Sequence, residues 1–411
     1  MDKNYFLTWT KQRDATILEV DRADFDEFVL RDGRRVFDFL STSFQASFGH
    51  SNATIIAAIK RQLDQMAIAS PKAAFELKDR VSERLLQTLN LGGGKLFYTV
   101  SGAEAVENAL KIVRHWTGRP VVLARRRSYH GASLGAMSVS GDWRSDSHLT
   151  FAEGTVRIPE PYDDPDGQTT RRIIESTGPY KIAAFILETI TGANGVIIPP
   201  QGWWDAIQSL CREFGILLIS DEVLCGFGRT GPDFGIHQFG VQPDLVCLSK
   251  AITGGYIPFG AVWTADRIAE RYDREVFACG LTSYAHPLGL AALDAVLDIL
   301  QNTDFRQHRQ VLDQQFAAWL ESLHKHAQVT QIRYRGLLAA IELKNAAPTW
   351  SELIERGVYA FSKQNMLVLA PPLTADPTRF QIAMTAVEKC IDSTSEKCQP
   401  NDSGRELKCE G

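Results

Sequence analysis

The chain has 411 residues, of which 44% are hydrophobic and 23% charged, with a formal net charge of -5. This composition is that of a globular enzyme and excludes disordered and fibrous chains. No basic block indicates a nucleic-acid partner, and no apolar run reaches the roughly 18 residues that a membrane helix needs. Because the start MDKNYFLTWT matches neither a secretory signal nor a transit peptide, we expect a cytoplasmic protein.

The chain is longer than one hydrophobic core usually organises, so two lobes are expected. We predict that segment 1–50 joins a small lobe, with a hairpin around Asp32 and Gly33. Residues 51–300 should form the large domain, 301–390 a small α+β domain, and 391–411 a polar, flexible tail. The seven cysteines are odd in number and include no Cys-x-x-Cys pair, which favours reduced core thiols and predicts no metal site.

Short apolar runs alternate with helical patterns after the helix predicted at 52–67. The runs are KLFYTV, PVVLA, AAFILE, GILLIS, DLVCLS and FGAVWT. Continuous runs of this kind suit strands buried on both faces, which predicts an α/β fold with a mainly parallel sheet covered by helices. Beyond residue 300, the helical pattern 313–327, the strand pattern 336–344 and a helix from Trp350 predict the small lobe.

The strand KLFYTV leads through Ser101, Gly102 and Ala103 into an amphipathic helix, with Glu104 at the capping-box position. Small residues at a helix N-terminus leave amide groups free, and together with the helix dipole these suit a phosphate. An ordinary capped helix has the same pattern.

The strand GILLIS delivers Asp221 at its carboxyl end, the edge at which open α/β sheets bind ligands. A buried carboxylate needs a partner there, and the protonated nitrogen of a pyridine ring is suitable. A Mg²⁺ ligand or a helix cap is the alternative reading.

The strand DLVCLS ends at Lys250, which a glycine-rich turn follows. Partial burial lowers the pKa of a lysine and frees its amine to attack an aldehyde. A lysine that extends to the surface is the alternative. Tyr129 and His130 follow the strand PVVLA, and an aromatic ring at this edge suits either stacking on a planar ligand or packing.

Four predicted strands therefore end in a phosphate site, an aromatic ring, a carboxylate and an amine. Together these groups are what pyridoxal phosphate (PLP) chemistry requires.

The strings LLISDEVLCGFGRTG and PDLVCLSKAITGGYIPFGAV resemble those of the class III aminotransferases, and the resemblance spans residues 20 to 375. It implies a fold-type I PLP transferase with a sheet of the seven-stranded type. It implies a ping-pong exchange between an amino donor and a keto acid or aldehyde, with Lys250 as the Schiff-base lysine and proton carrier and Asp221 on the pyridine nitrogen.

The resemblance also assigns residues around the cofactor. Ser101, Gly102 and Ala103 would hold the phosphate and Tyr129 would stack on the ring, while His130 and Val223 would also bind the cofactor. Thr282 would reach the cofactor of a neighbouring subunit, which implies a homodimer with shared active sites. Phe44 and Glu188 are expected near the substrate.

Four departures from the family pattern bear on the substrate. Ala132 stands where 4-aminobutyrate enzymes carry an arginine, and Ala193 stands where ornithine and 4-aminobutyrate enzymes carry a gating glutamate. Leu367 and Val368 replace the arginine that binds an α-carboxylate, and Phe361 lies near the place of an ω-transaminase arginine. These departures favour an amine or ω-amino donor, and another arginine could still bind a carboxylate, the candidates being Arg144, Arg333, Arg335 and Arg379.

Other classes of protein share parts of this pattern. A PLP-dependent aminomutase, racemase or decarboxylase would keep Lys250 and Asp221. A nucleotide-binding oxidoreductase should have G-x-G-x-x-G after its first strand, which this chain lacks. A binding or scaffold protein would leave the aspartate and lysine pair idle.

Overall fold

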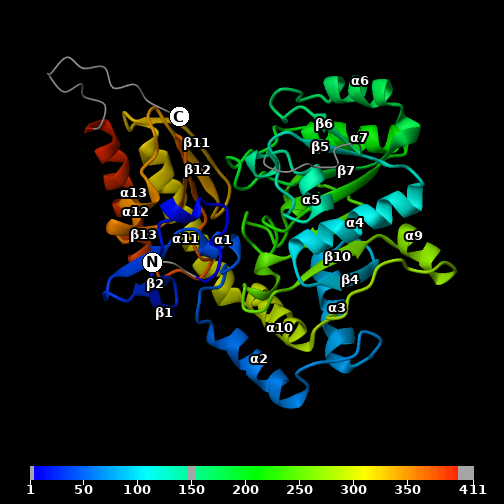
Figure 1. Ribbon diagram of the computed structural model, residues 1–411, viewed down its shortest axis with the longest axis horizontal. Helices are drawn as coiled ribbons and strands as arrows, with labels where there is room; N and C mark the ends of the chain where they lie inside the picture. Colours follow the sequence, from blue (N-terminus) through cyan, green and yellow to red (C-terminus); the bar gives the residue numbers. More distant parts are fainter. Residues whose placement is uncertain (1–3, 147–153, 397–411) are drawn as a thin grey trace.

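The computed structural model describes residues 4–146 and 154–396, and these form two lobes (Figure 1). The large lobe contains a seven-stranded sheet, and the small lobe contains two four-stranded sheets. Helix α10 (Pro287–Gln301) ends the large lobe, and α11 (Thr303–Leu323) begins the small one. The α/β fold predicted from the apolar runs is confirmed, whereas the predicted limits 1–50 and 51–300 stay predictions.

The seven-stranded sheet is parallel except for β10. Its order is β4 (Lys95–Thr99), β10 (Gly260–Thr264), β9 (Leu245–Leu248), β8 (Leu217–Asp221), β7 (Ile182–Glu188), β5 (Val121–Arg125) and β6 (Thr155–Ile158). Strand β10 pairs antiparallel with both β4 and β9. All seven residues of β7 are buried, as expected of a strand covered on both faces. The six runs read from the sequence lie in this sheet, and β6 was not predicted because its sequence TVRI is short and contains an arginine.

Helices cover both faces of this sheet. On one face, α4 (Gly102–Thr117) and α5 (Leu134–Val139) share a core with β9 and β10. On the other face, α3 (Glu76–Leu89), α7 (Trp203–Phe214) and α10 pack with α2 (Ala53–Gln65) into the main core. The remaining helices of this lobe are α6 (Gln168–Thr177), α8 (Gly235–Phe239) and α9 (Asp266–Ala269). Because both faces are covered, only the strand ends open toward the small lobe.

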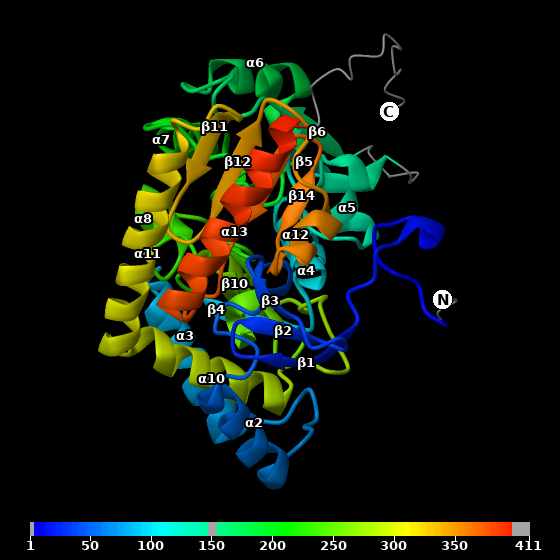
Figure 2. The same ribbon diagram turned by 90° about the vertical axis from the view of Figure 1, so that its left-hand side faces the viewer.

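The small lobe combines the two ends of the chain. The meander β1 (Val20–Asp24), β2 (Glu27–Leu30) and β3 (Arg35–Asp38) pairs in parallel with β13 (Val358–Tyr359). The second sheet has the order β11 (Val329–Tyr334), β12 (Ala339–Leu343), β15 (Met366–Leu369) and β14 (Phe361–Lys363). Figure 2 shows α11, α12 (Trp350–Glu355) and α13 (Pro377–Glu396) beside these strands.

One predicted boundary is wrong. Helix α13 continues to Glu396, and Ile391 within it is fully buried, so residues 391–396 do not belong to a flexible tail. Apolar Ile391 continues the core face of the helix despite the polar residues around it. Residues 397–411 of that predicted tail lie outside the described residues. In the described part of the chain, no helix is long and apolar enough to cross a membrane.

Candidate active site

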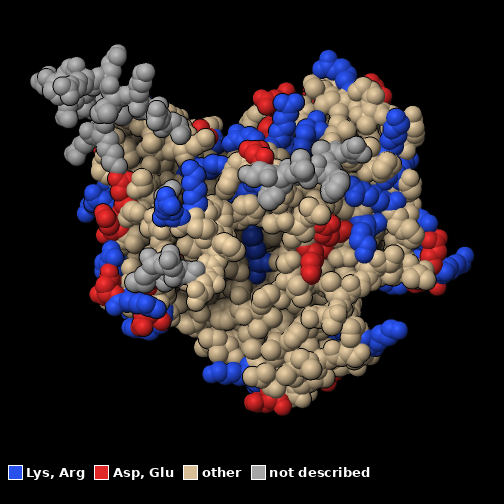
Figure 3. Space-filling view, in the orientation of Figure 1, with Lys and Arg blue, Asp and Glu red and all other residues tan. Residues whose placement is uncertain are grey.

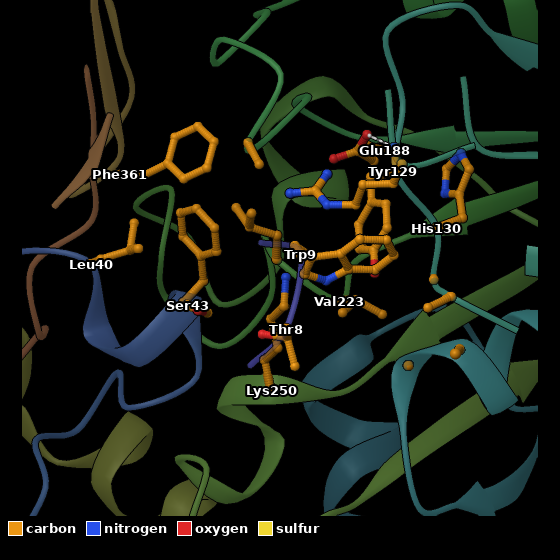
Figure 4. A pocket seen from close by; sticks show the side chains of 18 of the residues that line it. Thr8, Trp9, Leu40, Ser43, Tyr129, His130, Glu188, Val223, Lys250 and Phe361 are labelled. Carbon is orange, nitrogen blue, oxygen red and sulfur yellow. Dashed lines mark hydrogen bonds between the residues drawn. The ribbon is translucent and has the colours of Figure 1, made fainter. Parts of the chain in front are cut away.

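A cavity of about 1010 Å³ lies between the lobes at the carboxyl ends of β7, β8 and β9. Figure 3 shows a hollow at the centre of this face with a basic side chain inside it. In Figure 4, Lys250 points into the cavity, with Tyr129 and Trp9 on one side and Phe361 on the other. Its volume reaches the upper end of the range for small-molecule sites, so it can hold a cofactor together with a substrate.

Lys250 lies just beyond the end of β9 and begins a short 3-10 helix, η4 (Lys250–Thr253). Its φ of +51° is a left-handed conformation that is uncommon outside glycine and is typical of functional sites. Its Nζ lies 5.1 Å from the ring centroid of Phe44. Burial lowers the pKa of Lys250, and the charges of Asp221 and Glu188 partly oppose this shift. The amine is therefore a free base, and so a nucleophile, at a lower pH than an exposed lysine.

Asp221 ends β8 and is 3% exposed. Its Oδ1 accepts a hydrogen bond of 3.0 Å from the amide of Val223, and its Oδ2 lies 2.7 Å from Nδ1 of His130. These bonds hold the carboxylate in place at the cavity, where both Asp221 and His130 line the wall. The buried Nε2 of His130 has no hydrogen-bond partner among the described residues.

The first turn of α4 lies at the cavity through Gly102 and Ala103. Ser101 caps this helix, since its Oγ accepts a 3.2 Å bond from the amide of Glu104. The expected capping box is only half formed, because Glu104 accepts from the amide of Val100 rather than from that of Ser101. The 16-residue helix thus presents free amide groups and its positive end to the cavity, which together suit an anion.

Gly131 brings the Tyr129 and His130 loop against this turn. Its φ is +139°, and a Cβ there would come within 2.7 Å of the Cβ of Ala103. Tyr129 donates its amide to Glu188 Oε1 at 3.2 Å, while Glu188 Oε2 accepts from Gly192 at 2.9 Å. Burial raises the pKa of Glu188. Glu188 therefore anchors two loops at the cavity wall.

Phe44 reaches the cavity from an unusual turn. Ser41, Thr42, Ser43 and Phe44 all have positive φ, from +46° to +72°, in the short segment α1 (Ser41–Phe44). Ser41 donates to the carbonyl of Ala370 at 2.7 Å, and this bond fixes the turn to the small lobe. A run of left-handed residues is strained, and it persists only where contacts with the surrounding structure hold it in place.

Nearly all of the predicted site residues line this cavity: Phe44, Gly102, Ala103, Tyr129, His130, Glu188, Asp221, Val223 and Lys250. Ser101 lies behind the first turn of α4 as its cap. Thr282 is exposed and does not line the cavity of its own chain.

The cavity has the groups that PLP requires. A carboxylate, an amine and a helix N-terminus face one space, and the unpartnered Nε2 of His130 is a buried polar atom that a bound group could satisfy. The wall at Gly102 is closely fitted, since a Cβ there would lie 3.1 Å from the side chain of Val223. The residues present therefore fit the cofactor.

Several lining residues were not predicted, namely Thr8, Trp9, Leu40, Ser43, Trp143, Tyr359, Lys363 and Gln364. They come from loops and from the small lobe, where no periodicity or motif marks them. Of the four candidate arginines, only Arg144 lines the cavity. Arg333 is 2.6 Å from Glu342, Arg379 is 2.7 Å from Asp26, and Arg335 contacts the side chain of Gln238.

Known proteins resemble this chain in fold and in sequence. The family model for Aminotransferase class-III matches residues 8–391. Diaminobutyrate–2-oxoglutarate transaminase of Halomonas elongata is 30% identical over 90% of this chain and 89% of its own. Putrescine–pyruvate aminotransferase of Pseudomonas aeruginosa is 28% identical over 89% of this chain and 88% of its own. Taurine:2-oxoglutarate aminotransferase from Bifidobacterium kashiwanohense, solved with PLP and glutamate, superposes with a TM-score of 0.89 at 32% identity, covering 95% of this chain and 96% of the other.

Proposed function

This chain belongs to the class III aminotransferases and is a PLP-dependent transaminase, and from that premise we propose that its amino donor is an amine or an ω-amino compound. The amino group then passes to a keto acid or an aldehyde. The aminomutase, racemase and decarboxylase alternatives gain no support, since the relatives compared are all named as aminotransferases.

The observation that carries this proposal is the apolar wall of the cavity. Ala132, Ala193 and Phe361 all line it. The resemblance places Ala132 and Ala193 where family members carry charged residues, and it places Phe361 near the position of a further arginine. Leu367 and Val368, which stand in place of a further arginine, are fully buried in the small lobe. A donor with an apolar or uncharged end can pack against such a wall, whereas neutral side chains do not replace a two-point carboxylate clamp. Two of the relatives are named for putrescine and taurine, compounds that have no carboxylate next to the amine.

Bound PLP supplies an electron-accepting ring that makes loss of a proton from the donor carbon possible. We assign the transfer of that proton to Nζ of Lys250, whose lowered pKa favours the free base. The carboxylate of Asp221 would keep the ring nitrogen protonated, and the first turn of α4 would hold the phosphate. Tyr129 would pack on the ring, and Phe44 with Phe361 would shape the donor end.

The donor class is tested by titrating the purified holoenzyme and following its cofactor absorption. Butylamine, putrescine, taurine, ornithine and alanine form the panel. We expect butylamine, putrescine or taurine to remove the visible band at concentrations at least about tenfold below those needed for ornithine, since Ala193, Leu367 and Val368 stand where the resemblance places the charged residues that ornithine enzymes use. Equal response to ornithine and butylamine would contradict the proposed donor class.

We further propose a homodimer in which Thr282 of each subunit completes the other subunit's site. Its exposure away from the cavity of its own chain supports this arrangement. A cytoplasmic location remains a prediction from the sequence.

Mixed dimers test the shared site. Lys250→Ala and Thr282→Ala chains are unfolded together, refolded as a mixture, and assayed at limiting PLP. Half of the dimers should be mixed, and each should hold one site with both residues intact, so about a quarter of the wild-type activity returns. Activity no higher than that of the two separate variants would place Thr282 in its own subunit's site, and sedimentation of the wild-type protein checks the dimer itself.

A further inference from the structure

Besides Lys250, two cationic side chains line the cavity where a smaller recess joins it, a place called the mouth below. Neither side chain has a part in the chemistry proposed above. Arg144 belongs to η2 (Trp143–Ser145) of the large lobe, and Lys363 ends β14 of the small lobe. A recess of about 270 Å³ adjoins the mouth, and the residues common to both spaces are Trp143, Arg144, Ala193, Phe361, Lys363 and Gln364. The two cations therefore lie where the main cavity meets this recess.

Aromatic rings hold the guanidinium of Arg144. Its central carbon lies 4.3 Å from the ring centroid of Tyr129, 5.1 Å from that of Trp143 and 5.6 Å from that of Trp9. Its side chain is only 11% exposed. Stacking of this kind fixes the plane of the guanidinium, so little rotational freedom is lost when it binds a ligand.

Arg144 keeps donors free for such a ligand. Its Nη1 and its backbone amide donate to the carboxylate of Asp142. Within residues 4–146 and 154–396, neither its Nε nor its Nη2 donates a hydrogen bond. A guanidinium has five N–H groups, and its fork matches the two oxygens of a carboxylate.

Lys363 brings a second positive charge to the same mouth. Its Nζ lies 4.3 Å from the ring centroid of Trp143, and no carboxylate of the described residues lies within ion-pair distance of it. Partial burial lowers the pKa of Lys363, Arg144 acts in the same direction, and Asp142 and the exposed Asp146 oppose them. An anion at the mouth would stabilise both cations.

A keto acid acceptor gives these two cations a role. In a ping-pong exchange a keto acid enters the cavity that the donor has left, and its carboxylate must be recognised there. Apart from Lys250, the only lysine or arginine side chains that line this cavity in the described chain are Arg144 and Lys363. The charge of Arg144 also contributes to lowering the pKa of Lys250, so Arg144 is close enough to influence the reacting amine.

We propose that Arg144 and Lys363 form a carboxylate-binding subsite for the keto acid acceptor. Arg144 donates from its fork, and Lys363 adds a second charge across the mouth. The inference rests on the proposed transamination, and it explains how a chain without the family's usual arginines can still use a keto acid.

The test compares two acceptors in one enzyme. Pyruvate carries a carboxylate and butanal does not, so the ratio of their kcat/KM values isolates carboxylate recognition. We expect Arg144→Gln to lower this ratio about 10- to 100-fold, mainly through KM for pyruvate, since a charge-assisted hydrogen bond is lost. Arg144→Lys should fall in between because it lacks the fork. Lys363→Gln should lower the ratio about fivefold, and added salt should weaken that effect.

Lys344→Gln is the matched control, since Lys344 is exposed just beyond β12 and lies outside the cavity. It should leave the ratio unchanged. If Arg144→Gln lowers turnover of pyruvate and butanal equally, Arg144 only supports Tyr129 and the proposed subsite is refuted. The subsite is also refuted if neither Arg144→Gln nor Lys363→Gln changes the ratio of the two kcat/KM values. The ratio can be measured with whichever donor the wild type accepts, so failure of the proposed donor class gives a separate result.

Discussion

Replacing Lys250 by alanine should reduce amino transfer by about four orders of magnitude or more, because the proposed nucleophile and proton carrier is lost. The fold should persist. The side chain of Lys250 makes no hydrogen bond among the described residues, and its desolvated amine does not stabilise the native state. The free energy of urea unfolding of the apoprotein should stay within about 1 kcal/mol of the wild-type value.

Borohydride treatment sharpens this test. It should fix the cofactor covalently to the wild-type chain, and mass spectrometry of a digest should place the added mass on the peptide that carries Lys250. Lys344→Ala is the control, and it should retain both the adduct and turnover. Appreciable turnover by Lys250→Ala, or an adduct at another lysine, would overturn the assignment.

The strand-end residues could be predicted from the sequence because the geometry of a parallel sheet brings them together. Glu188 and Asp221 face each other in the register of β7 and β8, and Asp221 pairs with Cys247 of β9, three residues before Lys250. Apolar runs mark each strand, and the first polar residue after a run therefore lies at the shared edge.

The mouth of the cavity could not be predicted in this way. Trp9, Arg144 and Lys363 lie on an N-terminal loop, a 3-10 turn and an edge strand, and their meeting depends on how the lobes pack. The sequence left four arginines as candidates, and only the tertiary structure shows that Arg144 alone among them lines the cavity. The hydrogen bond between His130 and Asp221 could likewise not be predicted from the sequence, since 91 residues separate the two.

Asp221→Asn should lower kcat about 10²- to 10³-fold, which is the scale for removing one preorganised electrostatic contact. Asparagine keeps the size of the side chain and can still accept from the amide of Val223, but it removes the charge that would hold a proton on the ring nitrogen. The charge of Asp221 raises the pKa of Lys250. Its removal should therefore lower that pKa further, and capture of PLP by the apoprotein at neutral pH should not slow.

The neighbouring carboxylate Glu222 provides a matched control for this charge. It is fully buried, does not line the cavity, and accepts from the amides of Gly235 and Ile236. Burial raises its pKa to about 7, so it is already largely neutral at mildly acidic pH and Glu222→Gln should change turnover little there. A large loss of kcat in Asp221→Asn with normal PLP capture, and neither effect in Glu222→Gln, would assign the loss to the charge at the ring nitrogen. Equal losses in both variants would instead mean that this end of β8 acts only through its structure.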